Sequence, residues 1–389
     1  MGWVEKRNNG FRLVVDINDP FGKRKRKTKV VHTNSKRIAE KELVIFEAEL
    51  MKNISNNIDM KKINFEHFVE QWMEMYVNVH LEKTTQQNYS NYIYRRILPV
   101  FKHMYLNDIE TIHIVMFLND MFELKNQKKP VGQATRVYAY RVLRSLFQKA
   151  KEWYNIDPNP MDNVLKPKEN SSPNVDAYTE EESRQIMIAL QSENIQFRTL
   201  ITLAFTTGMR RGELLGLEWK HIDFENDCIH IKQSIPVFVD GKPHVKSPKT
   251  KGSIRIVAIP NYVTLELKEY KKVWDSWKSE NEDTWFEEGD FLFCNIRYHK
   301  NLGMPLFPKT LRERWQDFIK IRNPHIRYIR FHDIRHTSVS ILINRGIHAK
   351  IISERVGHSK IGTTMDVYGH LMRTAEAKAA DTFSDVFKV

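Results

Sequence analysis

The residues of this 389-residue chain that could perform chemistry lie in four short segments of its C-terminal half. These are TTGMRRGELLGLEW (206–219), SPKTKGSIRIVAIP (247–260), FHDIRHTSVSILINRG (331–346) and GHSKIGTTMDVYGH (357–370). They offer arginine, lysine and histidine side chains and one tyrosine that stands near two histidines. Guanidinium groups bind phosphate oxygens in a bidentate manner, and an imidazole can accept a phenolic proton. The combination predicts attack by a tyrosine on a phosphate.

A tyrosine needs help to act as a nucleophile. Its ordinary pKa is about 10, so ionising it at neutral pH costs on the order of 4 kcal/mol. Positive charges fixed around one phosphate would stabilise the charge that develops in the transition state. We expect no cofactor, since the chain has no GxxxxGK[ST] or GxGxxG loop for a nucleotide. We also expect no metal, because cationic side chains would take the role that divalent ions play in many nucleases.

The order and separation of these segments resemble the tyrosine recombinase family, the phage-type integrases. The motifs that carry the resemblance are TGMR followed by Glu213, the KT of the second segment, HDIR, VGH and VYGH. Lys249 is preferred over Lys251 as the lysine because it occupies the KT position ahead of the strand-like IRIVAI. By position, the resemblance implies six catalytic residues: Arg210, Lys249, His332, Arg335, His358 and Tyr368.

The resemblance also implies a role for each of these side chains. Tyr368 would form a 3′-phosphotyrosyl link with DNA while the two arginines clamp the phosphate. Lys249 would protonate the leaving 5′ oxygen, His332 would act as base or proton relay, and His358 would donate a hydrogen bond to the phosphate. Glu213 is expected to orient a basic side chain from one helical turn beyond Arg210. His336 is expected to support the site or the core.

The balance of charge predicts an anionic polymer as partner. The chain has 61 Lys and Arg against 48 Asp and Glu, a net charge of +13 and a pI near 9.4. Residues 1–37 alone hold eleven basic and three acidic residues, in runs whose turn residues predict a short sheet and then a helix from Ser35 to Met51. A disordered basic arm or a localisation signal is the alternative. The residues expected to contact phosphates there are Lys23, Arg24, Lys25, Arg26, Lys27 and Lys29.

Apolar residues recur at helical spacing between residues 63 and 168, as in Phe65, Phe68 and Trp72, and predict a helical core. On another face of the last helix, Arg141, Arg144 and Lys151 suit either phosphate contacts or an ordinary solvated surface. The polar segment KPKENSSPNV (166–175) predicts a linker. After it, Thr179 and Glu182 form the pattern of a capping box that would open a new domain.

These features predict an α+β multidomain protein. With the resemblance, they imply an N-terminal β-sheet domain that binds arm-type DNA sites (1–60) and an α-helical domain that binds core sites (61–168). A linker (169–176) and a mainly α catalytic domain with a small antiparallel sheet (177–389) would follow. The implied partners are double-stranded attachment sites, three further copies of the chain in a tetramer, and an excisionase or DNA-bending protein.

Three other classes of protein compete with this interpretation. HDIRH places two histidines at the spacing of a zinc metalloprotease, but Asp333 stands where that motif has glutamate. A non-catalytic DNA-binding regulator would explain the charge and the helix-turn-helix character of residues 349–370, but not Arg210 and His332. A type IB topoisomerase would use similar phosphotyrosyl chemistry, and the basic N-terminal and helical middle parts favour recombination over it.

The remaining features argue against secretion and metal binding. No run of about twenty apolar residues is present for a membrane span, and MGWVEKRNNG lacks the apolar run of a secretory signal. A cytoplasmic location and no membrane partner are therefore expected. Cys228 and Cys294 are far apart and lack CxxC spacing, so we expect two small buried side chains.

Overall fold

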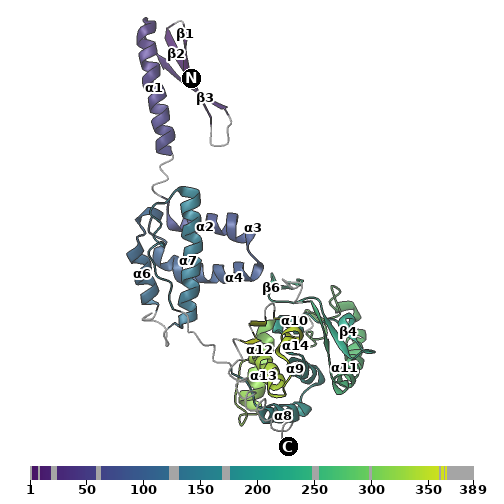
Figure 1. Ribbon diagram of the computed structural model, residues 1–389. Coiled ribbons are helices and arrows are strands. Elements are labelled where there is room, and N and C mark those ends of the chain that lie inside the picture. The colour runs from purple at the N-terminus through teal and green to yellow at the C-terminus, as the bar shows by residue number, and fades with distance from the viewer. Residues whose placement is uncertain are drawn as a thin grey trace, which may run out of the picture. The chain divides into compact units, whose positions relative to one another are not determined.

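The computed structural model describes residues 2–7, 9–18, 24–57, 63–121, 131–168, 176–247, 254–297, 300–358, 361–362 and 364–365, without the side chains of 17–18, 24–25 and 51–57. The chain forms two compact units, Met1–Asn170 and Ser171–Val389 (Figure 1). The three expected domains stay a prediction. The predicted site residues Lys23, Lys249 and Tyr368 lie outside the described residues, as do Lys251 and most of the expected linker.

The first unit begins with a three-stranded antiparallel sheet in the order β1–β2–β3, followed by the long helix α1. Phe11 and Leu13 of β2 pack with Ala39 of α1 in a small apolar cluster. The sheet and helix are thus formed as expected, although α1 runs beyond Met51. Their bounds are β1 (Gly2–Arg7), β2 (Gly10–Asn18), β3 (Arg24–Val31) and α1 (Lys36–Asn57).

The basic residues of β3 do not share one face of this sheet. Side chains alternate along a strand, so residues an odd number apart point to opposite faces. Lys29 pairs with Leu13, on the side covered by α1, and its Nζ lies 3.5 Å from Oε2 of Glu42. Arg26 points to the open face, where its guanidinium lies 5.1 Å from the centre of the Trp3 ring.

The rest of the first unit is helical around one apolar core. Phe65, Phe68 and Trp72 lie on one face of α2 and are fully buried, as their spacing predicts. Leu143 and Phe147 of α7 belong to the same core. The helices are α2 (Phe65–Trp72), α3 (Asn78–His80), α4 (Lys83–Tyr92), α5 (Leu98–Phe101), α6 (Thr111–Asp120) and α7 (Gln133–Tyr154), with π turns at Met73–Val77 and Ile93–Ile97.

The second unit is mainly helical, and its first helix starts at the predicted capping box. Oγ1 of Thr179 accepts from the Glu182 amide at 3.1 Å, and Oε2 of Glu182 accepts from the Thr179 amide at 2.7 Å. Helix α9 is buried along most of its length, with α11 and α13 packed against it (Figure 1). The helices are α8 (Glu180–Ala189), α9 (Ile195–Thr207), α10 (Arg211–Leu215), α11 (Asn261–Glu280), α12 (Pro308–Asp317), α13 (Asp333–Asn344) and α14 (Ala349–Val356).

Small antiparallel sheets complete the second unit, so the expected fold class is confirmed. The larger has the strand order β4–β5–β8, and β8 lies within the predicted strand IRIVAI. Across the described residues, every helix is too short or too polar to span a bilayer. The strands are β4 (Ile222–Asp223), β5 (Cys228–Ile231) and β8 (Arg255–Ala258), with β6 (Phe238–Val239) and β7 (Lys242–Pro243) as a separate hairpin.

Candidate active site

Four of the predicted catalytic side chains lie at helix ends of the second unit. Arg210 is the N-cap of α10, directly after the end of α9. His332 precedes α13, and Arg335 lies in the first turn of that helix. His358 follows the glycine that ends α14. Helix ends leave backbone groups free to hold neighbouring side chains, which suits them to positioning a site.

Two arginine–carbonyl hydrogen bonds draw these helix ends together. Nη1 of Arg335 donates to the carbonyl of Gly208 at 2.7 Å, and Nη2 of Arg210 donates to the carbonyl of Gly357 at 2.8 Å. Both glycines end their helices in the left-handed conformation, with φ of 63° and 70°. Residues more than a hundred positions apart in the chain therefore meet in one place.

Glu213 organises the basic side chains beneath this meeting point. It is only 3% exposed, and it accepts hydrogen bonds from the amide of Arg210 at 2.8 Å and from Nη1 of Arg210 at 2.9 Å. Nη2 of Arg255 donates to Oε2 of Glu213 at 2.9 Å, and Nη1 of Arg255 donates to Oε1 at 3.2 Å. Burial alone would raise the pKa of Glu213, but the hydrogen bonds and charges of Arg255 and Arg210 hold that pKa below its ordinary value. Glu213 is therefore a buried carboxylate anion that fixes two guanidinium groups.

Arg255 is the member of this cluster that the sequence reasoning missed. Its side chain is 6% exposed, and its Nε donates to the carbonyl of Arg355 near the end of α14 at 2.7 Å. It links β8, α10 and α14 through these contacts. A charged residue inside the otherwise apolar strand IRIVAI was a signal of a buried partner, because buried charges need pairing.

The histidines of the site are held neutral. Partial burial and the nearby Arg335 lower the pKa of His332, whose ring lies 5.6 Å from that of His336. Burial, the neighbouring His332 ring and Arg335 lower the pKa of His336. Burial, Arg335 and Arg210 lower the pKa of His358 from 6.5 to about 4. Burial first, and nearby positive charge second, thus lowers the pKa of all three imidazoles.

The ring of His358 is fixed by its neighbours. Its amide donates to the carbonyl of Ser353 at 2.9 Å, which closes the end of α14. Its Nδ1 lies 2.7 Å from the hydroxyl of Thr364, a fully buried residue that the sequence reasoning did not single out. If the Thr364 hydroxyl donates to Nδ1, the imidazole proton lies on Nε2, which is then available as a donor.

The structure brings together Arg210, His332, Arg335 and His358, with Glu213 and His336 beside them. Lys249 and Tyr368 lie outside the described residues, so their roles stay predictions. Within the described ranges, no third metal-binding side chain joins His332 and His336, so the geometry lends no support to the metalloprotease alternative. The arrangement supplies two guanidinium groups and neutral imidazoles at one place, which suits it to bind and activate a phosphate diester.

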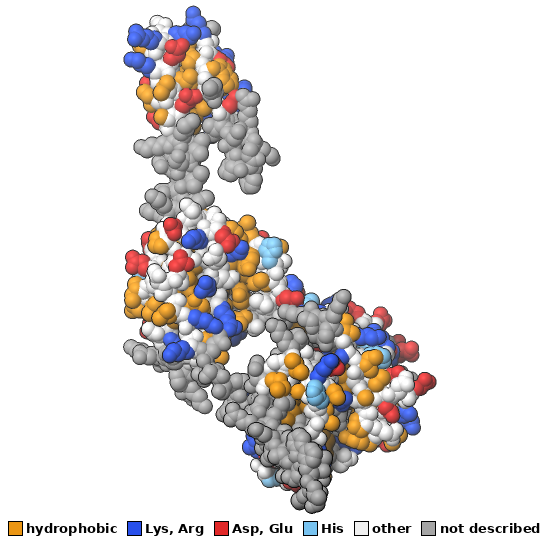
Figure 2. All heavy atoms as spheres, viewed as in Figure 1, with side chains coloured by type: hydrophobic (Ala, Val, Ile, Leu, Met, Phe, Trp, Pro, Cys, Tyr) orange, Lys and Arg blue, Asp and Glu red, His pale blue; other side chains and the backbone are white. Residues whose placement is uncertain are grey.

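The predicted DNA-contact residues belong to the first unit and differ in their surroundings. The side chains of Arg24 and Lys25 are not described, whereas Arg26 and Lys27 are exposed. In the face drawn in Figure 2, both described parts of that unit present Lys and Arg side chains interspersed with acidic ones. Their contact with DNA stays a prediction.

On α7 the three predicted basic residues are exposed but not equivalent. Nη1 of Arg144 donates to the hydroxyl of Tyr140 at 2.9 Å. Nζ of Lys151 lies 3.7 Å and 3.9 Å from carboxylate oxygens of Asp157 and Asp162. Arg141 is exposed on the same helix. Lys151 would have to leave two acidic neighbours to contact a phosphate, so it is the weakest of the three candidates.

Comparison with known proteins gives the family of both units. The model of the "Phage integrase family" matches residues 177–374, and that of the "Phage integrase, N-terminal SAM-like domain" matches residues 64–122. A protein named tyrosine recombinase XerC-like, from Caldanaerobacter subterraneus subsp. tengcongensis, is 27% identical over 99% of this chain and 98% of its own length. The ICEBs1 integrase of Bacillus subtilis is 32% identical over 63% of each chain.

Solved structures share the fold. The Tn1549 transposon integrase in complex with transposon right end DNA has a TM-score of 0.63 at 18% identity, covering 80% of this chain and 98% of that one. A lambda integrase dimer bound to a COC′ core site has a TM-score of 0.58 at 19% identity, covering 94% and 95%. The arrangement of helices and small sheets is therefore shared with proteins that were solved on DNA.

Proposed function

This chain belongs to the phage integrase family, and we propose that it cuts DNA with Tyr368 at the site formed by Arg210, His332, Arg335 and His358. It is a site-specific recombinase of a mobile element, a DNA strand breaking and rejoining enzyme. The observation that carries the proposal for the site is the meeting of these four side chains at helix ends, where the buried Glu213 holds Arg210.

In the first step, the Tyr368 oxygen attacks a backbone phosphorus. The new phosphorus–oxygen bond forms as the bond to the 5′ oxygen breaks, so the DNA keeps a 3′-phosphotyrosyl link and a free 5′ hydroxyl. His332 accepts the phenolic proton, because its lowered pKa keeps the ring neutral and able to act as a base. Lys249 gives a proton to the leaving oxygen.

The two arginines stabilise the negative charge that develops on the phosphate. Guanidinium groups can each present two donors to the non-bridging oxygens, which a lysine cannot reproduce. His358 adds a hydrogen bond from Nε2, with Thr364 holding its other nitrogen. A 5′ hydroxyl from a second duplex then attacks the phosphotyrosyl bond and reseals the strand without ATP, since the bond keeps the energy of the original diester.

The partner is DNA, and the chain works as an oligomer on it. We propose a homotetramer, because exchange between two duplexes needs four cuts, and a lambda integrase tetramer on a Holliday junction has the same fold. The N-terminal sheet domain (1–60) would bind arm-type sites, the helical domain (61–168) core sites, and residues 177–389 would cut. An excisionase or a DNA-bending protein would assist, and the work would take place in the cytoplasm.

The test is capture of the covalent intermediate. The full chain is incubated with a duplex that carries the junction sequence of its own element and a nick close to the cleavage site. After cleavage, the short fragment that carries the new 5′ hydroxyl diffuses away, so the strand cannot be resealed. Denaturing electrophoresis should show a protein–DNA adduct with the natural chain and none with Tyr368→Phe. The reason is that phenylalanine keeps the ring but lacks the attacking oxygen.

A matched control is Tyr262→Phe, which removes an exposed hydroxyl from α11 of the same unit and should leave the adduct intact. An adduct that persists in Tyr368→Phe would assign the nucleophile to another tyrosine. Relaxation of supercoiled DNA without any joining of two duplexes would support the topoisomerase alternative instead.

A further inference from the structure

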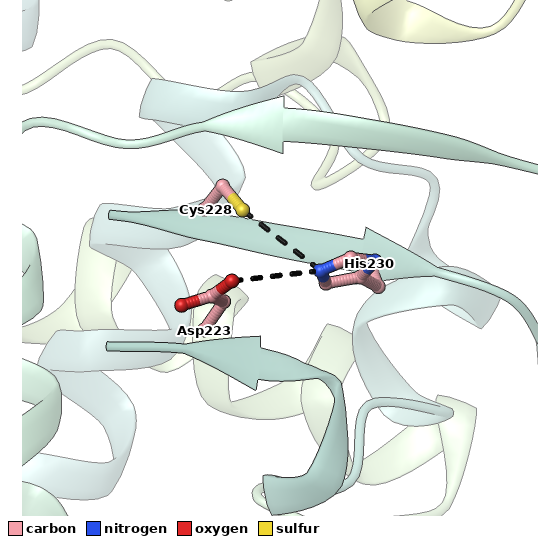
Figure 3. A group of neighbouring side chains, drawn as sticks. All are labelled: Asp223, Cys228 and His230. Atoms are coloured by element: carbon pink, nitrogen blue, oxygen red, sulfur yellow. Dashed lines mark hydrogen bonds and ion pairs between the residues drawn. The ribbon is translucent and has the colours of Figure 1, made fainter. Parts of the chain in front are cut away.

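Three potential metal ligands share one face of the sheet formed by β4, β5 and β8. Asp223 of β4 lies directly opposite Cys228 of β5 in the antiparallel register, so their side chains point to the same face. His230 follows Cys228 by two residues on β5 and therefore also lies on that face. Figure 3 shows the three side chains turned toward one another, with the His230 ring reaching both partners.

The distances among these atoms approach those of a metal site. Nε2 of His230 lies 3.9 Å from Sγ of Cys228 and 4.0 Å from Oδ2 of Asp223, and all the donor atoms lie within 4.8 Å of one another. A tetrahedral ion with bonds of about 2.0 to 2.3 Å holds its ligand atoms roughly 3.3 to 3.8 Å apart. Small rotations of the three side chains, without movement of the strands, would bring the ligand atoms to the distances of a tetrahedral site.

Asp223 is already oriented by its surroundings. Its Oδ1 accepts from the amides of Glu225 and Asn226 at 3.1 and 3.0 Å, and its Oδ2 accepts from the Asn226 side chain at 2.8 Å. Hydrogen bonds of this kind hold ligating carboxylates in place around metal ions. Oδ2 keeps a further lone pair, and it is the oxygen nearest His230.

The site is accessible and leaves one position open. The side chains of Asp223 and His230 are 28% and 30% exposed, while Cys228 is buried at its base. On the same face, β8 places Ala258 opposite Cys228 and Ile256 opposite His230, and neither can bind a metal. A water molecule would therefore complete the coordination of an ion with three protein ligands.

We propose that Asp223, Cys228 and His230 bind one zinc-type divalent ion. Thiolate and imidazole ligands together select zinc and similar transition metals over magnesium or calcium, which prefer oxygen. Binding releases the thiol proton to solvent, and the bound ion links β4 to β5. The ion plays no part in strand transfer, so the proposal stands or falls independently of the role assigned to Tyr368.

The experiment uses the full chain, freed of metal with a chelator and then titrated with Co²⁺. The expected result is one equivalent of bound Co²⁺ with a thiolate-to-cobalt charge-transfer band in the near ultraviolet, which Zn²⁺ displaces. Zn²⁺ should also raise the melting temperature, because a ligand that binds only the folded state stabilises it. Removing a protein ligand should weaken binding by about tenfold or more.

Variants separate this site from accidental binding. Cys228→Ser should abolish the band, because the thiolate is lost, and His230→Gln should weaken Co²⁺ binding by about tenfold or more. Cys294→Ala, which changes the other buried cysteine, and His325→Gln, which changes an exposed histidine, should keep both the band and the natural affinity. If Cys228→Ser fails to fold, the partly exposed His230→Gln still decides the question. No band in the natural chain, a band that survives in Cys228→Ser, or an unchanged Co²⁺ affinity in His230→Gln would overturn the proposal.

Discussion

At the scale of single residues, Glu213 determines where two arginines point. It is buried, charged and shared between Arg210 and Arg255, so neither guanidinium can turn without leaving a buried carboxylate short of partners. Such a loss is costly, since a buried charge without its hydrogen bonds is destabilised by several kcal/mol. We infer that Arg255 is a positioning residue, which acts on the phosphate site through Glu213 and α14.

Arg255→Lys tests this inference. Lysine keeps the charge but cannot contact both Glu213 and the Arg355 carbonyl as the guanidinium does. The rate of covalent adduct formation at saturating DNA should fall about tenfold to a hundredfold, which corresponds to the roughly 1.5–3 kcal/mol of hydrogen bonds to charged groups. DNA affinity, measured by titration, should change little.

Arg345→Lys is the matched control for that variant. Arg345 makes the same two-pronged contact with a glutamate, Glu180, but on the surface. Exposed pairs contribute little, so the control should keep the natural rate. Equal rates for Arg255→Lys and the natural chain would show that Arg255 does not position the site.

The pKa of His358 should depend on what occupies the site. In the free chain it is about 4, against 6.5 for an ordinary histidine, because of burial and two arginines. The unfolded chain therefore takes up a proton at a higher pH than the folded one, so this residue costs stability as pH falls from about 6.5 toward 4. A phosphate between the arginines should raise the pKa by offsetting their charge.

NMR titration of the imidazole checks this expectation. The His358 signal, assigned by its loss in His358→Asn, should stay constant from neutral pH down to about pH 5 in the free chain. It should begin to titrate at a higher pH when the DNA site is bound. A His358 signal that titrates near 6.5 without DNA would mean that the arginines do not surround it as described.

At the scale of elements, the left-handed glycine that ends α14 joins the helix to the site. A Cβ added at Gly357 would lie 2.8 Å from Nη1 of Arg255, and φ is +70° there. Gly357→Ala should therefore both strain the backbone, by about 1–2 kcal/mol, and displace Arg255. We expect a lower melting temperature and a slower formation of the covalent adduct.

Gly346→Ala separates the two effects. Gly346 has φ of +78°, yet an added Cβ would meet nothing within 4 Å. This variant should lose a similar amount of stability while keeping the natural rate. If both variants slow the reaction equally, general destabilisation accounts for the loss rather than the contact with Arg255.

The elements also show what the sequence could and could not predict. The capping box at Thr179 and the apolar stripe of α2 depend on local spacing, and both were predicted from it. The partnership of Arg255 with Glu213 spans 42 residues, and no local pattern sets such a distance. Strand alternation divides the basic residues of β3 between two faces, but no local pattern shows which of the two faces α1 covers. Lys249 and Tyr368 remain expectations from their motifs.

At the scale of the whole molecule, positive charge is concentrated at one end of the chain. Residues 1–37 hold eleven of the 61 basic residues and only three of the 48 acidic ones. On the sheet that they form, Arg12 and Arg26 share the open face, whereas Lys29 lies beside Glu42 on the side of α1. These three residues contribute equally to the net charge, but the fold places them on different faces of the sheet.

The salt dependence of DNA binding distinguishes Arg12 and Arg26 from Lys29. Each phosphate that a protein neutralises adds about 0.9 to the slope of log affinity against log salt. The full chain in which both Arg12 and Arg26 are changed to glutamine is titrated with DNA that carries arm-type sites. The slope should fall by roughly twice the amount expected for one phosphate. Arg26 and Lys29 each have an acidic partner, Asp16 at 3.1 Å and Glu42 at 3.5 Å, so the face of the sheet is what distinguishes them. Lys29→Gln should leave the slope nearly unchanged, because Lys29 lies on the side covered by α1. The reverse ranking would place the face that meets DNA on the side of α1, and would require that helix to move aside before the sheet could bind.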